Sequence, residues 1–302
     1  MAAASWDGSC RIWEFNDSYS SSRFLTLHQE QKEAVLRCLF SPDSDILYFG
    51  NTKGEIKALN YGQSTKTTPS VVCPLLESPV TGLKACTEKA CVVAGSMGGA
   101  VVVFDPKSKD NFLILHETQN SPIVNIDVGQ TMIYFATAGR AVRRLDLRNP
   151  NQKAMNIECK IPSQITSIAC NTQGNCCIAG STCGFVEMMS DDVAKYNQYR
   201  CHRSDNARTM TSSNMVSVSR EKDVGMSVGG DGTVYFFNLM TPKKPRETKV
   251  TQIPLTACTF APKGGVVAVA SGYDWSRGAE FYKKEKLSVE IIVKKLGQND
   301  IP

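Results

Sequence analysis

The sequence has no long hydrophobic run, and this absence limits what the protein can be. A transmembrane helix needs about 20 consecutive apolar residues, whereas the most apolar stretch, residues 264–271, has only the length of a strand. The N-terminal segment MAAASWDGSC has no basic part followed by an apolar part, so it does not resemble a secretory signal. We therefore expect no membrane insertion and a location in the cytosol or nucleus. The 12 cysteines are then expected to be reduced, most of them as small buried apolar side chains.

The residues that carry catalysis and bind metals are also scarce. There are three histidines, His28, His116 and His202, and none is spaced with Cys, Asp or Glu as a set of metal ligands. No C-x-x-C pair, no G-x-S-x-G nucleophile motif and no phosphate-binding P-loop is present. These absences argue against a metal site, a bound cofactor and an enzymatic reaction. We therefore expect no catalytic residues.

What the sequence does contain is a repeat built around short turns that include glycine. Each turn leads into a strand-like run rich in Val, Ile, Phe and Tyr, as in SWDGS before CRIWEF and GGDGT before VYFFNL. The turn glycines recur at about 40–48 residues, the period of propeller blades, at Gly8, Gly54, Gly99, Gly139, Gly184 and Gly232. Glycine at these positions permits the positive φ that a tight hairpin between two strands requires.

Another strand candidate precedes every hairpin except the first. These runs span residues 35–40, 80–85, 123–128, 165–169, 215–219 and 255–260. A four-stranded unit cannot bury both of its faces alone, whereas units stacked side by side can. The sequence therefore predicts an all-β fold, a seven-bladed WD-repeat β-propeller that forms a single domain over residues 1–302. The blades are expected at about residues 1–27, 33–76, 79–116, 122–159, 164–202, 213–251 and 254–295.

The first and last blades are expected to be incomplete. The chain starts directly on what reads as the second strand of the first blade, residues 2–5, so the innermost strand of that blade is missing. In the last blade, residues 266–271 and 288–293 are clear strands, but no outer strand follows them. Propellers commonly close when the N-terminal segment supplies that outer strand. Our hypothesis is that the sequence lacks its natural first segment, or that the propeller closes imperfectly.

The formal net charge of +5 is mild, but the basic residues are clustered. The clusters are Lys243, Lys244 and Arg246; Lys283, Lys284 and Lys286; and Lys294 and Lys295. Clusters of this kind attract RNA or acidic peptides. Each of them is also compatible with an ordinary solvated surface.

Five segments have a distinctive sequence: SWDGSCRIWEF at 5–15, TAGRAVRRLDLRN at 137–149, YRCHRSDN at 199–206, GGDGTVYFFN at 229–238 and ASGYDWSRGAEFY at 270–282. They resemble one branch of the WD-repeat family, that of the nuclear-pore poly(A)+ RNA export factor and its paralogue, the mitotic spindle-checkpoint protein. The Tyr-Asp-Trp-Ser and Cys-His-Arg parts are the most specific. The segment at 270–282 is closer to the export factor, and the segment at 137–149 is closer to the checkpoint protein.

The resemblance implies a non-enzymatic adaptor in the nucleus, at the nuclear envelope and pore, and in the cytoplasm. Members of this branch bind a short acidic peptide, the GLEBS motif, of a nucleoporin or of checkpoint kinases. We favour the nucleoporin and a role in mRNA export, because the Tyr-Asp-Trp-Ser match is the longer and less generic one. A spindle-assembly checkpoint adaptor at kinetochores is the alternative. Direct RNA binding is a second alternative, since the basic clusters are accompanied by Tyr273 and Trp275.

The same resemblance gives candidate partner-binding residues, which are Trp6, Arg140, His202, Arg203, Tyr273, Asp274 and Trp275. Trp6 is either an aromatic anchor for a partner or a side chain packed against a neighbouring blade. Arg140 either pairs with a peptide carboxylate or is an ordinary exposed turn residue. His202 either contacts the partner or is a buried, hydrogen-bonded structural histidine. Residues 273–275 lie in an irregular insertion, which favours a binding surface.

One hairpin departs from the pattern of the branch. The branch reads Ser-x-Glu-Gly-Arg-Val in the fifth blade, whereas residues 181–186 read STCGFV. The arginine that pairs with glutamates of the acidic peptide therefore falls on Phe185, and the preceding Glu falls on Cys183. A charge-assisted hydrogen bond contributes about 1.5–3 kcal/mol, and a phenyl ring cannot form one. Either the partner motif differs, or another cation such as Arg140 or Arg203 substitutes, or the peptide site has been lost.

Overall fold

The computed structural model describes residues 1–30, 32–42, 45–62, 69–73, 76–108, 112–117, 121–192, 196–203, 209–241, 243–282, 289–297 and 300–301. The basic cluster of Lys283, Lys284 and Lys286 lies outside these ranges, as do residues 204–206 of the Cys-His-Arg motif. Regular structure in the described ranges is almost entirely strand, with two 3₁₀ helices, η1 (Thr87–Lys89) and η3 (Ala279–Phe281). No helix there is long and apolar enough to cross a membrane.

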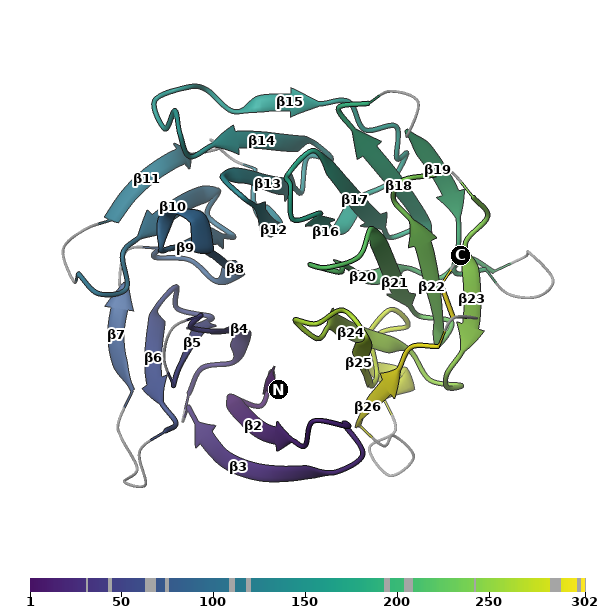
Figure 1. The fold of residues 1–302 in the computed structure, drawn as a ribbon, viewed down its shortest axis with the longest axis horizontal. Helices are drawn as coiled ribbons and strands as arrows, with labels where there is room; N and C mark the ends of the chain where they lie inside the picture. Colours follow the sequence, from purple (N-terminus) through teal and green to yellow (C-terminus); the bar gives the residue numbers. More distant parts are fainter. Residues whose placement is uncertain are drawn as a thin grey trace. The chain divides into compact units, whose positions relative to one another are not determined.

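The described strands form seven antiparallel sheets, each built from strands consecutive in the chain (Figure 1). The first four sheets are β1 (Ala2–Ala4), β2 (Ser9–Phe15) and β3 (Ser22–Gln29); β4 (Val35–Phe40), β5 (Ile46–Asn51), β6 (Ile56–Asn60) and β7 (Ser70–Cys73); β8 (Val80–Cys86), β9 (Cys91–Ser96), β10 (Ala100–Phe104) and β11 (Phe112–Glu117); and β12 (Ile123–Gly129), β13 (Met132–Thr137), β14 (Val142–Asp146) and β15 (Met155–Ile157).

The last three sheets are β16 (Ile165–Cys170), β17 (Cys176–Ser181), β18 (Phe185–Ser190) and β19 (Asn197–Arg200); β20 (Ser213–Val218), β21 (Val224–Gly229), β22 (Thr233–Asn238) and β23 (Arg246–Lys249); and β24 (Leu255–Phe260), β25 (Val266–Ser271) and β26 (Glu290–Lys295). Each sheet is one blade, so the prediction of an all-β, seven-bladed propeller is confirmed.

The chain divides into two compact units. Unit 1 comprises Met1–Gly139 and Arg144–Met155, and unit 2 comprises Arg140–Arg143 and Asn156–Pro302. Within each unit the first strands of successive blades contact one another, as β4 contacts β8 and β16 contacts β20. The apolar cores lie between these neighbouring sheets. Burying one Phe, Ile or Leu side chain in such a core stabilises the fold by about 1.5–3 kcal/mol.

Two contacts illustrate how closely the sheets pack within the units. In unit 1, a Cβ on Gly82 would clash with the side chain of Ile126 in the next blade, so only glycine fits there. In unit 2, the rings of Tyr199 and Phe237 from successive blades have centroids 5.1 Å apart. The apolar strands of the sequence therefore stabilise each blade through contacts with the next blade of the same unit.

The first and last sheets contain three strands each in the described residues. β1 pairs with β2 through the partners Ala2–Ile12 and Ala4–Cys10, in the place that the second strand holds in the other blades. In the last sheet β26 pairs with β25, and no described strand pairs with its other edge. The expected incomplete first blade is therefore confirmed. A missing first segment as its cause stays a prediction.

The turns between second and third strands share one backbone shape, with one exception to the sequence prediction. Gly54 and Gly184 have positive φ angles of 89° and 74°, and their N–H groups donate to the carbonyl oxygens of Asn51 and Ser181 at 3.3 and 3.1 Å. In the fourth blade the residue with positive φ is Arg140, at 65°. The prediction that Gly139 fills this position was therefore wrong by one residue, because the left-handed residue is the third after the second strand ends and β13 ends at Thr137.

Candidate functional site

In each of the three blades of unit 2, the turn after the second strand lies beside the segment that leads into the blade. In each blade one backbone N–H of the turn donates to a carbonyl oxygen of that segment at 3.0 Å. The donor–acceptor pairs are Thr182–Gln164, Gly230–Ser212 and Gly272–Pro254. We call this end of the three sheets the turn edge. It comprises the turns 182–184 and 230–232, the described part of the insertion, 272–282, and the leading segments 158–164, 201–203, 209–212 and 250–254. All the predicted site residues except Trp6 lie on it or against it.

Arg140 is attached to the turn edge at the fifth blade. Its exposed guanidinium donates through Nη1 to the carbonyl oxygen of Pro162 at 2.9 Å. The next residue, Ser163, places its hydroxyl 2.8 Å from the Sγ of Cys183 in the β17–β18 turn. Arg140 and this turn are therefore connected through the same leading segment.

Phe185, which replaces the expected arginine, lies between two other arginines. It opens β18 directly opposite Arg200 in β19. The Arg200 guanidinium carbon lies 5.7 Å from the centroid of the Phe185 ring, and that of Arg203 lies 5.9 Å from it. Both distances are within the range in which a cation is attracted to an aromatic face. Phe185 stands where the resemblance implies an arginine, and two other arginine side chains lie beside it.

The two arginines differ in their surroundings. Arg200 is exposed, whereas Arg203 is half-buried. Among the described residues, the Nε of Arg203 is buried and has no hydrogen-bond partner. A buried donor without a partner costs about 1–3 kcal/mol.

His202 is a structural residue, which corrects the expectation that it contacts a partner. It is 0% exposed, and its two ring nitrogens are engaged, Nδ1 with Asp231 at 2.9 Å and Nε2 with the hydroxyl of Ser227 at 2.7 Å. The ring of Tyr235 packs edge-on against it, with centroids 4.8 Å apart. No part of the imidazole reaches the surface, so His202 holds the segment leading into the sixth blade to the β21–β22 turn.

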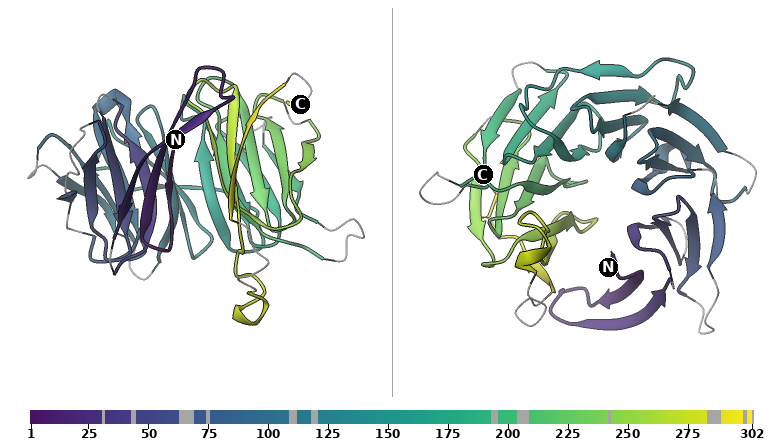
Figure 2. Two further views of the ribbon diagram at one scale, coloured as in Figure 1. Left: turned by 90° about the horizontal axis from the view of Figure 1, so that it is seen from below. Right: turned by 180° about the vertical axis from the view of Figure 1, so that it is seen from behind.

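The insertion of the last blade presents an aromatic cluster. Trp275 stacks on Tyr282 with centroids 5.0 Å apart, and Tyr273 lies edge-on to Trp275 at 5.3 Å. Trp275 is 57% exposed. Figure 2 shows the η3 segment of this insertion, in yellow, projecting beyond the end of its own sheet. Tyr273 and Trp275 are thus available at a surface.

Asp274 is anchored within the protein. Its Oδ2 accepts a hydrogen bond from the side-chain amide of Asn214 at 3.3 Å, and its Oδ1 accepts one from the hydroxyl of Ser276 at 2.7 Å. Asp274 therefore ties the insertion to the sixth blade, and it supports the aromatic cluster.

Trp6 belongs to unit 1, where it lies in the β1–β2 turn. It is 82% exposed. The neighbouring Asp7 accepts a hydrogen bond from the backbone N–H of Ser9 at 2.8 Å and pairs with Arg11 at 3.2 Å. The turn is thus held by Asp7, and the indole of Trp6 is left free to contact a partner.

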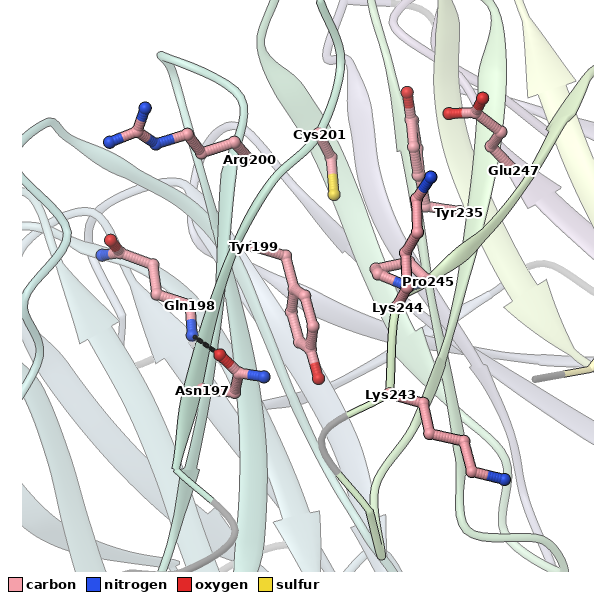
Figure 3. A pocket seen from close by; sticks show the side chains of 10 residues that line it. All are labelled: Asn197, Gln198, Tyr199, Arg200, Cys201, Tyr235, Lys243, Lys244, Pro245 and Glu247. Carbon is pink, nitrogen blue, oxygen red and sulfur yellow. Dashed lines mark hydrogen bonds between the residues drawn. The ribbon is translucent and has the colours of Figure 1, made fainter.

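A groove of about 390 Å³ runs along the outer strands of the fifth and sixth blades (Figure 3). Figure 3 shows Tyr199 and Cys201 on the side of β19 that faces Tyr235, while Arg200 points the other way. Burial raises the pKa of the Cys201 thiol above its usual range, which disfavours its thiolate form. The remaining lining residues are Asn197, Gln198, Lys243, Lys244, Pro245 and Glu247.

Metal ligands do not gather in the part of the chain that the structure describes, where no group of three His, Cys, Asp or Glu side chains is close enough to hold an ion.

Sequence reasoning missed the role of Arg200 and of Tyr282. Arg200 lies in the YRCHRSDN segment but was not among the candidate residues. Its contact with Phe185 depends on the β18–β19 register, which pairs Val186 with Tyr199 and so brings Phe185 opposite Arg200. Residues 197–200 read NQYR, without a clear alternation of apolar and polar side chains, so the sequence carried no local signal for this register.

Comparisons with known proteins extend over most of the chain. No protein-family model matches it. It is 25% identical over 294 residues to WD40 repeat protein poxJ of Penicillium oxalicum, covering 94% of this chain and 84% of the relative. It is 24% identical over 300 residues to mRNA export factor rae-1 of Caenorhabditis elegans, covering 93% and 78%. A chain in a crystal structure of the mitotic checkpoint complex has a similar fold, with a TM-score of 0.68, 13% identity and coverage of 90% and 83%. At that identity the likeness concerns the fold alone.

Proposed function

Because the chain belongs to the WD-repeat family, we propose that it is a non-catalytic adaptor that binds a short acidic peptide of a nucleoporin and supports mRNA export through the nuclear pore. The observation that carries this proposal is the similarity to an mRNA export factor along 93% of the chain. We further propose that the blades act as one domain, and that the protein works in the nucleus, at the nuclear pore and in the cytoplasm.

The chemistry of the turn edge supports an acidic peptide as the partner. Arg140, Arg200 and Arg203 supply guanidinium groups at the fifth blade, and each hydrogen bond to a carboxylate contributes about 1.5–3 kcal/mol. Trp275 on the turn edge and, separately, Trp6 in unit 1 each present an exposed indole, a residue type often found as a binding hot spot. Cations and aromatic anchors together are what an acidic peptide with apolar positions requires.

A binding measurement on the full chain tests the proposal. We expect an acidic peptide from a nucleoporin, labelled for fluorescence anisotropy, to bind the wild type, and Trp6→Ala to weaken it about 10-fold, a typical loss for an aromatic anchor. The thermal midpoint should not change, because Trp6 is 82% exposed. Met97→Ala is the matched control, since Met97 holds the same turn position in the third blade and is 51% exposed.

The identity of the captured partner decides between the two adaptor roles. Affinity capture with the full chain, followed by identification of the bound proteins, should recover a nucleoporin. Recovery of checkpoint kinases in its place would replace the export role by the checkpoint role. If the wild type binds no acidic peptide, the whole site is misassigned. If Trp6→Ala and Met97→Ala bind the peptide equally well, Trp6 is misassigned.

Single-stranded RNA is the second candidate ligand, and one observation favours it. Bases stack on exposed aromatic side chains, and the insertion presents Trp275 stacked on Tyr282. Trp275→Ala is then expected to lower RNA affinity, and measurement of RNA binding by anisotropy checks it.

A further inference from the structure

The ring of Phe185 is held in place by its own turn. The backbone N–H of Phe185 donates to the hydroxyl of Ser181 at 3.1 Å, and the same hydroxyl donates to the carbonyl oxygen of Phe185 at 3.0 Å. Ser181 is 0% exposed. Because Ser181 holds both the N–H and the C=O of Phe185, the backbone of Phe185 is preformed and a partner does not have to order it on binding.

Two guanidinium groups reach this ring from the strand and the segment that follow β18. Arg200 reaches it across the β18–β19 ladder, and Arg203 reaches it from the segment just after the buried His202. Attraction to the ring face contributes about 0.5–1 kcal/mol at an exposed site and restricts the otherwise mobile arginine side chains. We call Phe185, Arg200 and Arg203 the arginine–phenylalanine cluster.

The cluster offers two kinds of contact side by side. The guanidinium groups of Arg200 and Arg203 can donate hydrogen bonds to a carboxylate. The half-buried phenyl ring offers apolar surface. An aromatic side chain of a partner that packs on this ring would gain about 0.5–1.5 kcal/mol of binding free energy beyond the contribution of the buried area. A second carboxylate directed at the ring would lose water without gaining a donor, which is unfavourable.

We propose that the arginine–phenylalanine cluster selects a peptide in which an acidic residue is adjacent to an aromatic residue, and that it disfavours two adjacent acidic residues. This inference rests on the proposed function and specifies the partner of the same site. Specificity of this kind is a difference between two affinities, and the ring contributes to it both by attraction and by exclusion.

Three synthetic peptides of equal length test the inference. They are identical except at the centre, which reads Glu-Phe, Glu-Ala or Glu-Glu, and their binding to the full chain is measured by isothermal titration calorimetry. We expect the wild type to bind the Glu-Phe peptide about 10-fold more tightly than the Glu-Glu peptide, with the Glu-Ala peptide between them. Such a ratio corresponds to about 1.4 kcal/mol.

Variants of the cluster show which residue makes the choice. Phe185→Arg should reverse the order and prefer the Glu-Glu peptide, while Phe185→Gln should bind all three peptides alike. Arg200→Gln and Arg203→Gln should each lower the affinity for all three peptides several-fold without changing the order of their affinities. Lys263→Gln is the control for the same change in charge, since Lys263 is exposed in the β24–β25 turn, away from the turn edge.

The outcomes separate this inference from the proposed function. If the wild type binds the three peptides equally well, or if Phe185→Arg keeps the wild-type order, the inference is overturned and the acidic-peptide adaptor still stands. If none of the peptides binds the wild type, both are overturned. Thermal melts of every variant establish that it is folded, and Phe185→Gln supplies the answer if Phe185→Arg does not fold.

Discussion

At single positions the backbone and the side chain make separate demands, and Arg140 meets both at once. Its φ of 65° is left-handed, in a turn position that glycine holds in most of the other hairpins. The left-handed conformation costs an L-residue with a Cβ about 1–2 kcal/mol. The side chain in return hydrogen-bonds to Pro162 and leaves a cation exposed at the turn edge. A residue that is locally unfavourable for the backbone is consistent with a role outside folding.

A pair of substitutions at Arg140 separates these two demands. Arg140→Gly and Arg140→Ala both remove the guanidinium, but only glycine relieves the left-handed backbone. We expect Arg140→Gly to have a free energy of unfolding about 1 kcal/mol higher than Arg140→Ala, as measured by urea denaturation. Both variants should lower the affinity for an acidic peptide by the same factor. Equal stabilities of the two variants would show that the left-handed conformation is not retained in solution.

Asp7 makes the β1–β2 turn sensitive to pH. Partial burial raises the pKa of its carboxyl group, but hydrogen bonds from the side chain and backbone of Ser9, with others from Ser5 and Arg11, lower it to about 2 from an ordinary value of 3.8. A pKa that is lower in the folded state means that the ionised carboxylate stabilises the fold. This contribution is present above about pH 4 and is lost as the pH falls towards 2.

The stabilising effect of Asp7 is therefore expected to depend on pH only in the acid range. The wild type should exceed Asp7→Asn in free energy of unfolding by less than about 1 kcal/mol at pH 6, because exposed carboxylate pairs are screened by water. The difference should vanish by about pH 2. Urea denaturation of both proteins between pH 2 and 6 measures it, and a difference that grows as the pH falls would contradict the assignment.

At the scale of whole elements, the hairpin turns are joined to the segments that lead from one blade to the next. The link is clearest between the fifth and sixth blades, where Asp231 accepts a hydrogen bond from the N–H of Thr233 in its own turn and also contacts His202. Gly229 completes the packing, since a Cβ there would lie only 2.6 Å from the His202 ring carbon Cγ. One buried histidine thus fixes two elements that are separate in the sequence.

A double-mutant cycle tests this link. His202→Ala and Asp231→Ala should each lower the free energy of unfolding by about 2–3 kcal/mol, because each leaves a buried polar group without its partner. The double variant should lose clearly less than the sum, with a coupling of at least about 1 kcal/mol. Asp7→Ala is the matched control, since Asp7 holds the same turn position in the first blade. If it costs as much as Asp231→Ala, the histidine contributes nothing.

The elements also show how far the sequence could predict this molecule. Strands such as Val35–Phe40 and Leu255–Phe260 were predicted at the bounds that the structure has, because alternating branched and aromatic residues are a local signal. The burial of His202 and the pairing of Arg200 with Phe185 depend on contacts across blades and on strand register. Those contacts are set by packing, so motif reasoning could name Arg203 and Phe185 without seeing that they touch.

At the scale of the whole molecule, charge is the property that separates the two candidate ligands. The excess of 34 Lys and Arg over 29 Asp and Glu is small, so long-range attraction contributes little and local contacts decide. A peptide carboxylate held by Arg200 and Arg203 is partly shielded from salt, because Arg203 is half-buried. RNA carries condensed counterions that are released on binding, and release makes its affinity fall steeply with salt.

Salt titrations therefore give the two ligands different slopes. For single-stranded RNA that contacts three cations, the logarithm of the association constant should fall with a slope of about −2 against the logarithm of salt concentration, or about 20-fold between 50 and 200 mM. For the acidic peptide we expect a loss of less than about fivefold over the same range. Anisotropy titrations of both ligands on the full chain measure the slopes. A peptide slope as steep as that of RNA would mean that the peptide is held by exposed charges alone, and the Phe185 ring and the Trp6 indole would then have no part in binding.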